Sequence, residues 1–123
     1  MPSTEPRGPK QIYKAFIWSM KGLQAAWRHE ASFRLEAYLV VVLFPLGLWI
    51  GHGPLEKAIL AGSLILVLSA ELLNSAIEAI TDKASPEFHE LAGRAKDMGS
   101  AAVLFLMINV MLCWALILWP RFA

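Results

Sequence analysis

Long apolar runs separated by short polar segments predict three membrane-spanning helices in this chain. The expected spans cover about 35–50, 55–80 and 98–119. The third holds 22 uncharged residues, and 55–73 supplies 19 residues to the second, against the roughly 20 that a hydrocarbon core of about 30 Å requires. The first is short, with 16 residues, and it is apolar except for Glu36.

A different pattern precedes the first span. Over about 11–30, apolar residues recur at helical spacing, while Lys14, Lys21 and Arg28 recur every seven residues on another face. The apolar stripe consists of Tyr13, Phe16, Ile17, Met20, Leu23 and Trp27. A basic amphipathic helix of this kind is typical of one that lies on the membrane surface.

Composition agrees with a membrane protein. The chain has 123 residues, of which 57% are hydrophobic and 17% charged. A soluble domain typically has about 45–50% apolar and about 25% charged residues. We therefore expect an all-α membrane protein, with a flexible N-terminus at 1–10 and a single domain at 11–123. That domain holds the surface helix and the three transmembrane helices.

The positive residues indicate how the chain is oriented. Nine of the eleven Lys and Arg residues lie before the first span or between the second and the third. The other two are Lys57 and Arg121. Because cytoplasmic loops carry the excess of positive charge, the N-terminus and the 81–97 loop are predicted to be cytoplasmic.

A polar stripe at the end of the second span is the main candidate for chemistry. Its members fall within an arc of about 100° on one helix face, and they are Glu71, Asn74, Ser75, Glu78 and Asp82. Carboxylates beside lipid are costly, so such a stripe indicates a bound cation, a proton or a substrate. The stripe lies on the predicted cytoplasmic side, where nucleotides are available.

Two further features leave alternatives open. Glu30 falls about 40° from the direction of Phe16, on the apolar face of the surface helix. It is either a functional carboxylate or a helix end whose side chain reaches water. The segment 93–100 places cations, a carboxylate and small residues at the mouth of the third span. It is either a phosphate site, although its spacing fails the P-loop pattern, or an ordinary positive flank.

Three sequence blocks resemble the prokaryotic diacylglycerol kinase family. They are WRHEASFR at 27–34, ELLNSAIE at 71–78 and ELAGRAKDMGSAA at 90–102. The similarity extends from about Tyr13 onward, in the same order and with the same three-span plan. It implies an enzyme of the bacterial inner membrane that phosphorylates diacylglycerol from MgATP to give phosphatidic acid. It also implies a homotrimer whose active sites are shared between subunits.

The resemblance assigns roles to individual residues. Glu71 matches the general base, Asn74 its supporting hydrogen-bond partner, and Glu30 and Glu78 the magnesium ligands. The family residues that contact the nucleotide correspond here to Glu87, His89, Lys96 and Asp97. The family residues that line the lipid's approach correspond here to Trp27, Phe33, Arg34 and Ser100.

The chain departs from the family pattern at two positions in the surface helix. Gln11 stands where the family has an arginine, and Trp18 stands where it has a tyrosine. A phosphate contact at position 11 is therefore in doubt, while Trp18 keeps a ring for stacking on adenine but lacks the phenol.

Two other functions fit parts of the pattern. The acceptor could be a polyprenol such as undecaprenol, which related small membrane kinases phosphorylate. Alternatively, the polar stripe could belong to a small transporter of ions or protons. A transporter predicts acids spread through the depth of the bilayer, whereas here they cluster toward one leaflet.

Overall fold

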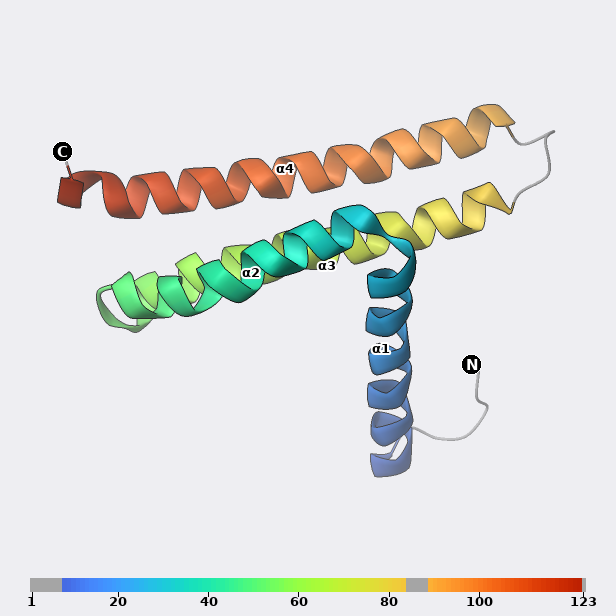
Figure 1. The fold of residues 1–123 in the computed structure, drawn as a ribbon, viewed down its shortest axis with the longest axis horizontal. Helices are drawn as coiled ribbons and strands as arrows, with labels where there is room; N and C mark the ends of the chain where they lie inside the picture. Colours follow the sequence, from blue (N-terminus) through green and yellow to red (C-terminus); the bar gives the residue numbers. More distant parts are fainter. Residues whose placement is uncertain (1–7, 84–88, 123) are drawn as a thin grey trace.

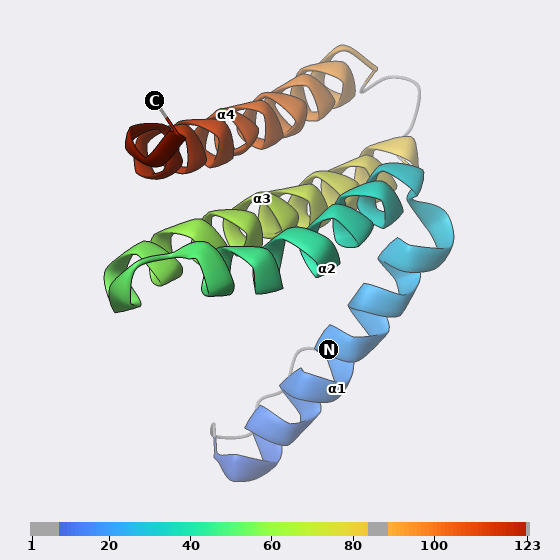
Figure 2. The same cartoon turned by 60° about the vertical axis from the view of Figure 1, so that its left-hand side comes forward.

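The computed structural model describes residues 8–83 and 89–122, which form four α-helices (Figure 1). The helices are α1 (Pro9–His29), α2 (Ala31–Ile50), α3 (Gly53–Asp82) and α4 (His89–Phe122). Helices α2, α3 and α4 run alongside one another, and α3 packs against both of the others (Figures 1 and 2). Helix α1 leaves the bundle at the start of α2 and points away from it.

Three of the helices are long and apolar enough to cross a membrane, namely α2, α3 and α4. At about 1.5 Å per residue, the 30 residues of α3 extend about 45 Å and the 34 residues of α4 about 51 Å. Both exceed a hydrocarbon core of about 30 Å. The end of α3 and the start of α4 therefore continue past the lipid core, and both carry polar residues there.

The polar segment at 81–97 is helical over much of its length, so α4 extends well beyond the expected third span. Helix α3 ends at Asp82, and α4 already begins at His89 rather than near 98. Hydropathy detects where lipid contact ends, but a helix can continue into water when its residues favour it. The first turns of α4 are rich in good helix formers such as Leu91, Ala92 and Ala95.

The first span is also longer than expected. Helix α2 begins at Ala31 rather than near 35, and its 20 residues reach the length that a hydrocarbon core requires. The helix continues through Pro45, which cannot donate a backbone hydrogen bond inside a helix. The expected span starts later than the helix because Arg34 marks the edge of the apolar run without interrupting the helix.

The three long helices meet closely at Gly47 of α2. A Cβ atom at this position would lie 3.2 Å from Cβ of Leu60 on α3 and 3.3 Å from the ring of Trp114 on α4. Leu60 is completely buried. The Trp114 indole N–H donates to the Leu60 carbonyl at 3.1 Å and to Ser63 Oγ at 3.3 Å. Small residues that permit close approach, combined with polar bonds between helices, are how membrane helices associate.

Arg121 joins the helices at the end of the bundle opposite the polar stripe. Its Nη1 donates to the Ile50 carbonyl at 2.6 Å, and its Nη2 pairs with the Glu56 carboxylate. The His52 backbone N–H donates to the same carboxylate at 2.9 Å. These bonds attach the last turn of α4 to the turn between α2 and α3, where Gly53 adopts a φ of +78° that favours glycine.

The apolar stripe of α1 has no cover within its own chain. All six of its members are exposed, and Ala26 is the one buried residue of this helix. Exposed apolar surface of this extent marks a contact with a membrane or another protein. Together with the basic residues on another face, it supports a helix that lies on the membrane surface.

We predict that Gly47→Ala destabilises the bundle relative to Gly62→Ala. Both substitutions remove a helical glycine, which favours the helix by about 1 kcal/mol. Only position 47 is crowded, since a Cβ at position 62 meets nothing within 4 Å. Overpacking typically costs about 1–3 kcal/mol. Unfolding in detergent mixtures measures the difference, and equal stability of the two variants would contradict the packing described here.

Candidate active site

The polar stripe predicted on the second span forms a partly buried face of α3. Because α3 is helical throughout, residues three and four apart share that face. Glu71, Asn74 and Ser75 are buried, Glu78 is half-buried, and Asp82 is exposed at the end of the helix. The side chains of the stripe therefore become more exposed toward the helix end that projects beyond the lipid core.

Glu36 of α2 joins this face, and the sequence analysis missed it. Glu36 is 8% exposed and Glu71 is 6% exposed, and their carboxyl groups lie within hydrogen-bonding reach of each other. In the sequence, Glu36 stands out only as the one charged residue of an otherwise apolar span. The signal was nevertheless present, because an ionisable residue within a membrane span is a candidate functional residue by itself.

Four carboxylates from three parts of the chain converge here. Glu30 lies at the joint between α1 and α2, and both Glu30 and Glu78 are within electrostatic reach of Glu71. Like charges gathered in a poorly solvated place repel one another unless cations or protons compensate them. The cluster, which consists of Glu30, Glu36, Glu71 and Glu78, therefore favours the binding of a cation or the transfer of a proton.

Several buried oxygen atoms at the cluster have no partner. Among the described residues, the buried side-chain atoms without a hydrogen bond are Glu36 Oε2, Asn74 Oδ1 and Ser75 Oγ. Buried polar atoms are almost always paired, so each exception calls for an explanation. All three lie on or beside the stripe of α3.

Asn74 is positioned by its contacts with two helices. Its Nδ2 donates to Glu78 Oε1 at 3.4 Å. On its other side α4 approaches closely, because Gly99 has no side chain. A Cβ at position 99 would lie 2.4 Å from Asn74 Oδ1 and 3.3 Å from Cδ1 of Ile77. Gly99 therefore makes room for the Asn74 amide, a role that the sequence analysis did not assign.

Lys96 is the cation nearest to the cluster among the predicted site residues of α4. Its Nζ lies 2.7 Å from Asp82 Oδ1 at the ends of α4 and α3, and it is also within electrostatic reach of Glu78. Asp97 and Ser100 are exposed on the same helix. Glu87 and the side chain of His89 lie outside the described residues.

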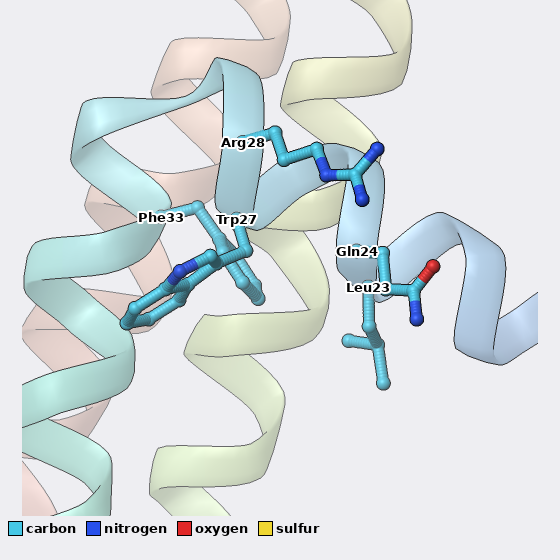
Figure 3. A pocket seen from close by; sticks show the side chains of 5 residues that line it. All are labelled: Leu23, Gln24, Trp27, Arg28 and Phe33. Carbon is cyan, nitrogen blue, oxygen red and sulfur yellow. The ribbon is translucent and has the colours of Figure 1, made fainter.

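Of the residues predicted to line the lipid's approach, Trp27, Phe33 and Arg34 lie where α1 joins α2, whereas Ser100 lies on α4. A hollow of about 470 Å³ is lined by Leu23, Gln24, Trp27, Arg28 and Phe33 (Figure 3). The Trp27 and Phe33 side chains both line this hollow, while the Arg28 side chain points away from the Trp27 ring. Arg34 does not line the hollow. Its Nη1 donates to the carbonyls of Trp27 and Arg28, at 2.7 and 3.3 Å.

The carboxylates of the acid cluster can supply only some of the oxygen ligands that a hard cation such as Mg²⁺ requires. No group of three or more His, Cys, Asp and Glu residues in the described ranges is arranged to hold a metal ion. Magnesium prefers oxygen ligands, retains several waters and is often bound by one or two carboxylates together with substrate phosphates. Glu30 and Glu78, which both lie within electrostatic reach of Glu71, would supply two such carboxylates.

The chain matches the model of the prokaryotic diacylglycerol kinase family over residues 17–118. It belongs to this family. It is 45% identical over 115 residues to a diacylglycerol kinase of Escherichia coli K12, covering 94% of each chain. It is 41% identical over 111 residues to a diacylglycerol kinase of Haemophilus influenzae, covering 90% of this chain and 94% of the relative. The resemblance seen in the three sequence blocks is thus confirmed.

Membership in the diacylglycerol kinase family makes this chain an enzyme, a phosphotransferase embedded in a membrane. A kinase needs a base or positioning group at the attacking hydroxyl and positive charge around the transferred phosphoryl group. The acid cluster with Asn74 and the neighbouring Lys96 supplies groups of both kinds at one end of the bundle.

We predict that Gly99→Ala lowers kinase activity by about tenfold or more while the protein stays folded. The added methyl group has no room beside Asn74 Oδ1, so the amide must rotate away from Glu78. A loss of about 1.4 kcal/mol in transition-state stabilisation already gives a tenfold effect. Turnover is compared with that of Gly62→Ala, where the methyl group meets open space. Equal turnover of the two variants would show that the Asn74 position is unimportant.

Two substitutions of Glu36 test its role beside Glu71. Glu36→Gln keeps an amide that can hydrogen-bond to the Glu71 carboxylate, whereas Glu36→Leu removes every polar partner at similar volume. Because a hydrogen bond to a charged group contributes about 1.5–3 kcal/mol, we expect the leucine variant to be at least about tenfold less active than the glutamine variant. Steady-state rates at matched protein yield measure this. Wild-type activity in the leucine variant would remove Glu36 from the site.

Proposed function

We propose that this protein phosphorylates diacylglycerol to phosphatidic acid with MgATP at the cytoplasmic face of the bacterial inner membrane. The observation that carries the proposal is the buried carboxyl pair of Glu71 and Glu36 on the membrane-spanning helices, close to Asn74. The names of the relatives support diacylglycerol as the acceptor. The excess of positive residues at this end supports the cytoplasmic orientation.

In the proposed reaction, Glu71 is the general base. The free hydroxyl oxygen of diacylglycerol attacks the γ-phosphorus of ATP, and the bond from that phosphorus to the β,γ-bridging oxygen breaks. The hydroxyl proton passes to the Glu71 carboxylate, and ADP leaves. General-base assistance of this kind typically contributes about 10²–10⁴-fold to the rate. Asn74 and Glu36 hold the base in place.

The charge of the triphosphate is compensated from both sides of the cluster. Glu30 and Glu78 would bind Mg²⁺, which neutralises charge on the phosphate oxygens when it is bound. Lys96 contributes a cation from α4, and the incoming phosphates replace Asp82 as its partner. Asp97 is proposed to contact the nucleotide, as are Glu87 and His89 from the adjoining segment.

The lipid is proposed to approach from the joint between α1 and α2. There the hollow beside Trp27 and Phe33 is lined mainly by apolar side chains and lies at the level where a surface helix meets the membrane. Ser100 on α4 is proposed to contact the lipid from the other side. The Arg34 guanidinium, by contrast, is hydrogen-bonded to the end of α1 and does not face the hollow.

We also propose that the protein works as a homotrimer. The chain leaves many large apolar side chains exposed on α1 and α4, and few residues of α4 are fully buried. Lipid accounts for part of this surface. Glu30 and Glu78 are only half-buried, and a neighbouring subunit covers such carboxylates more readily than lipid tails do, which supports active sites shared between subunits.

Transfer of labelled phosphate from MgATP in mixed micelles tests the proposed reaction. We expect phosphatidic acid from diacylglycerol with the wild-type protein, and a loss of at least about 100-fold with folded Glu71→Gln, since the amide cannot accept the proton. Undecaprenol serves as a parallel acceptor. Product from undecaprenol alone would refute diacylglycerol as the acceptor, and undiminished activity of Glu71→Gln would refute the assigned base.

A further inference from the structure

The joint between α1 and α2 consists of a single residue, Glu30. Its backbone is extended, with φ −120° and ψ 106°, yet hydrogen bonds bridge it on both sides. Its N–H donates to the Ala26 carbonyl at 2.9 Å, and its own carbonyl accepts the Arg34 N–H at 3.2 Å. Glu30 is thus both the C-cap residue of α1 and the N-cap residue of α2. A joint this short leaves little freedom in the backbone beside the Glu30 carboxylate.

The Arg34 side chain reaches back across the joint. Its Nη1 donates to the carbonyl of Trp27 at 2.7 Å and to that of Arg28 at 3.3 Å. These carbonyls belong to the last turn of α1, where the helix leaves acceptors without partners. A cation at this place also interacts favourably with the negative end of the helix dipole. The guanidinium therefore ties the end of α1 to the second turn of α2.

An aromatic contact forms a second tie between the same two helices. The rings of Trp27 and Tyr38 meet edge to face, with centroids 5.3 Å apart and an interplanar angle of 71°. Such pairs contribute about 0.5–1.5 kcal/mol beyond their buried area. Few other contacts restrain α1. Ala26 is its one buried residue, and its main contacts are a small number with α2.

We propose that Arg34, assisted by Tyr38, is a positioning residue that locks the direction of α1 and thereby holds the Glu30 carboxylate at the acid cluster. The functional part of this inference rests on the proposed role of Glu30 in binding Mg²⁺. It assigns Arg34 to the geometry of the metal site, whereas the family resemblance placed it on the path of the lipid. The two assignments predict different measurements.

Distances between spin labels test the lock without relying on activity. Labels are placed at Lys14→Cys on α1 and Ile80→Cys on α3, both away from the joint, in a Cys113→Ser background. Labelled chains are diluted with unlabelled chains in lipid nanodiscs, so that only distances within one chain contribute. We expect one narrow distance distribution in the parent, and a distribution at least about twofold broader in Arg34→Met, which keeps an apolar stem and loses the donors.

Three further variants sharpen this test. Lys21→Met removes a positive charge from the exposed face of α1 and should leave the distribution unchanged. Arg34→Lys keeps the charge with a single ammonium group, so it should restore part of the narrow distribution. Tyr38→Leu should broaden it less than Arg34→Met. An unchanged distribution in Arg34→Met would overturn the lock, whatever happens to activity.

The kinetic measurement separates the two roles of Arg34. The lock predicts that Arg34→Met raises the Mg²⁺ concentration for half-maximal activity about tenfold, with less than a twofold change in the apparent KM for diacylglycerol. A raised lipid KM with unchanged Mg²⁺ dependence would overturn the inference in favour of direct lipid contact. If the parent protein phosphorylates no lipid at all, the proposed function fails, while the spin-label distances still decide whether the lock exists.

Discussion

The free-energy cost of placing carboxylates next to lipid governs the organisation of this protein. Glu71 and Glu36 are nearly completely buried on helices that are otherwise suited to span a membrane, and Glu30 and Glu78 lie close by. Such a cluster is tolerated only where protons, cations or a polar ligand compensate it. At the helix ends that project beyond the lipid core, Lys96 pairs with Asp82 and lies within electrostatic reach of Glu78. The proposed phosphoryl transfer uses this arrangement, because its substrates provide the missing partners.

Features that depend on one helix could be predicted from the sequence, and features that depend on two could not. The stripe through Glu71, Asn74 and Glu78 follows from helical period alone. The approach of Glu36 to Glu71, and of Gly99 to Asn74, depends on how far neighbouring helices are shifted along each other, which no single-chain periodicity reports. Hydropathy locates lipid contact rather than helix formation, so the expected third span does not by itself give the start of α4 at His89.

The surface helix contributes to the site through its joint rather than through its length. Helix α1 has little packing of its own, and its apolar face has no cover within the chain. The bonds of Arg34 to the last carbonyls of α1 and the contact of Trp27 with Tyr38 fix its direction. At the opposite end of the bundle, Arg121 performs a comparable task by joining α4 to the turn after α2. The acid cluster lies at the end of the bundle that holds the joint between α1 and α2, opposite the attachment made by Arg121.

The central claim is that phosphoryl transfer takes place at the acid cluster, and an experimental structure with Mg²⁺, a non-hydrolysable ATP analogue and diacylglycerol tests it most directly. The account predicts the metal on Glu30 and Glu78, and the lipid hydroxyl within hydrogen-bonding distance of Glu71, in line with the terminal phosphate. A nucleotide bound in a productive pose elsewhere, with the lipid hydroxyl remote from Glu71, would contradict it.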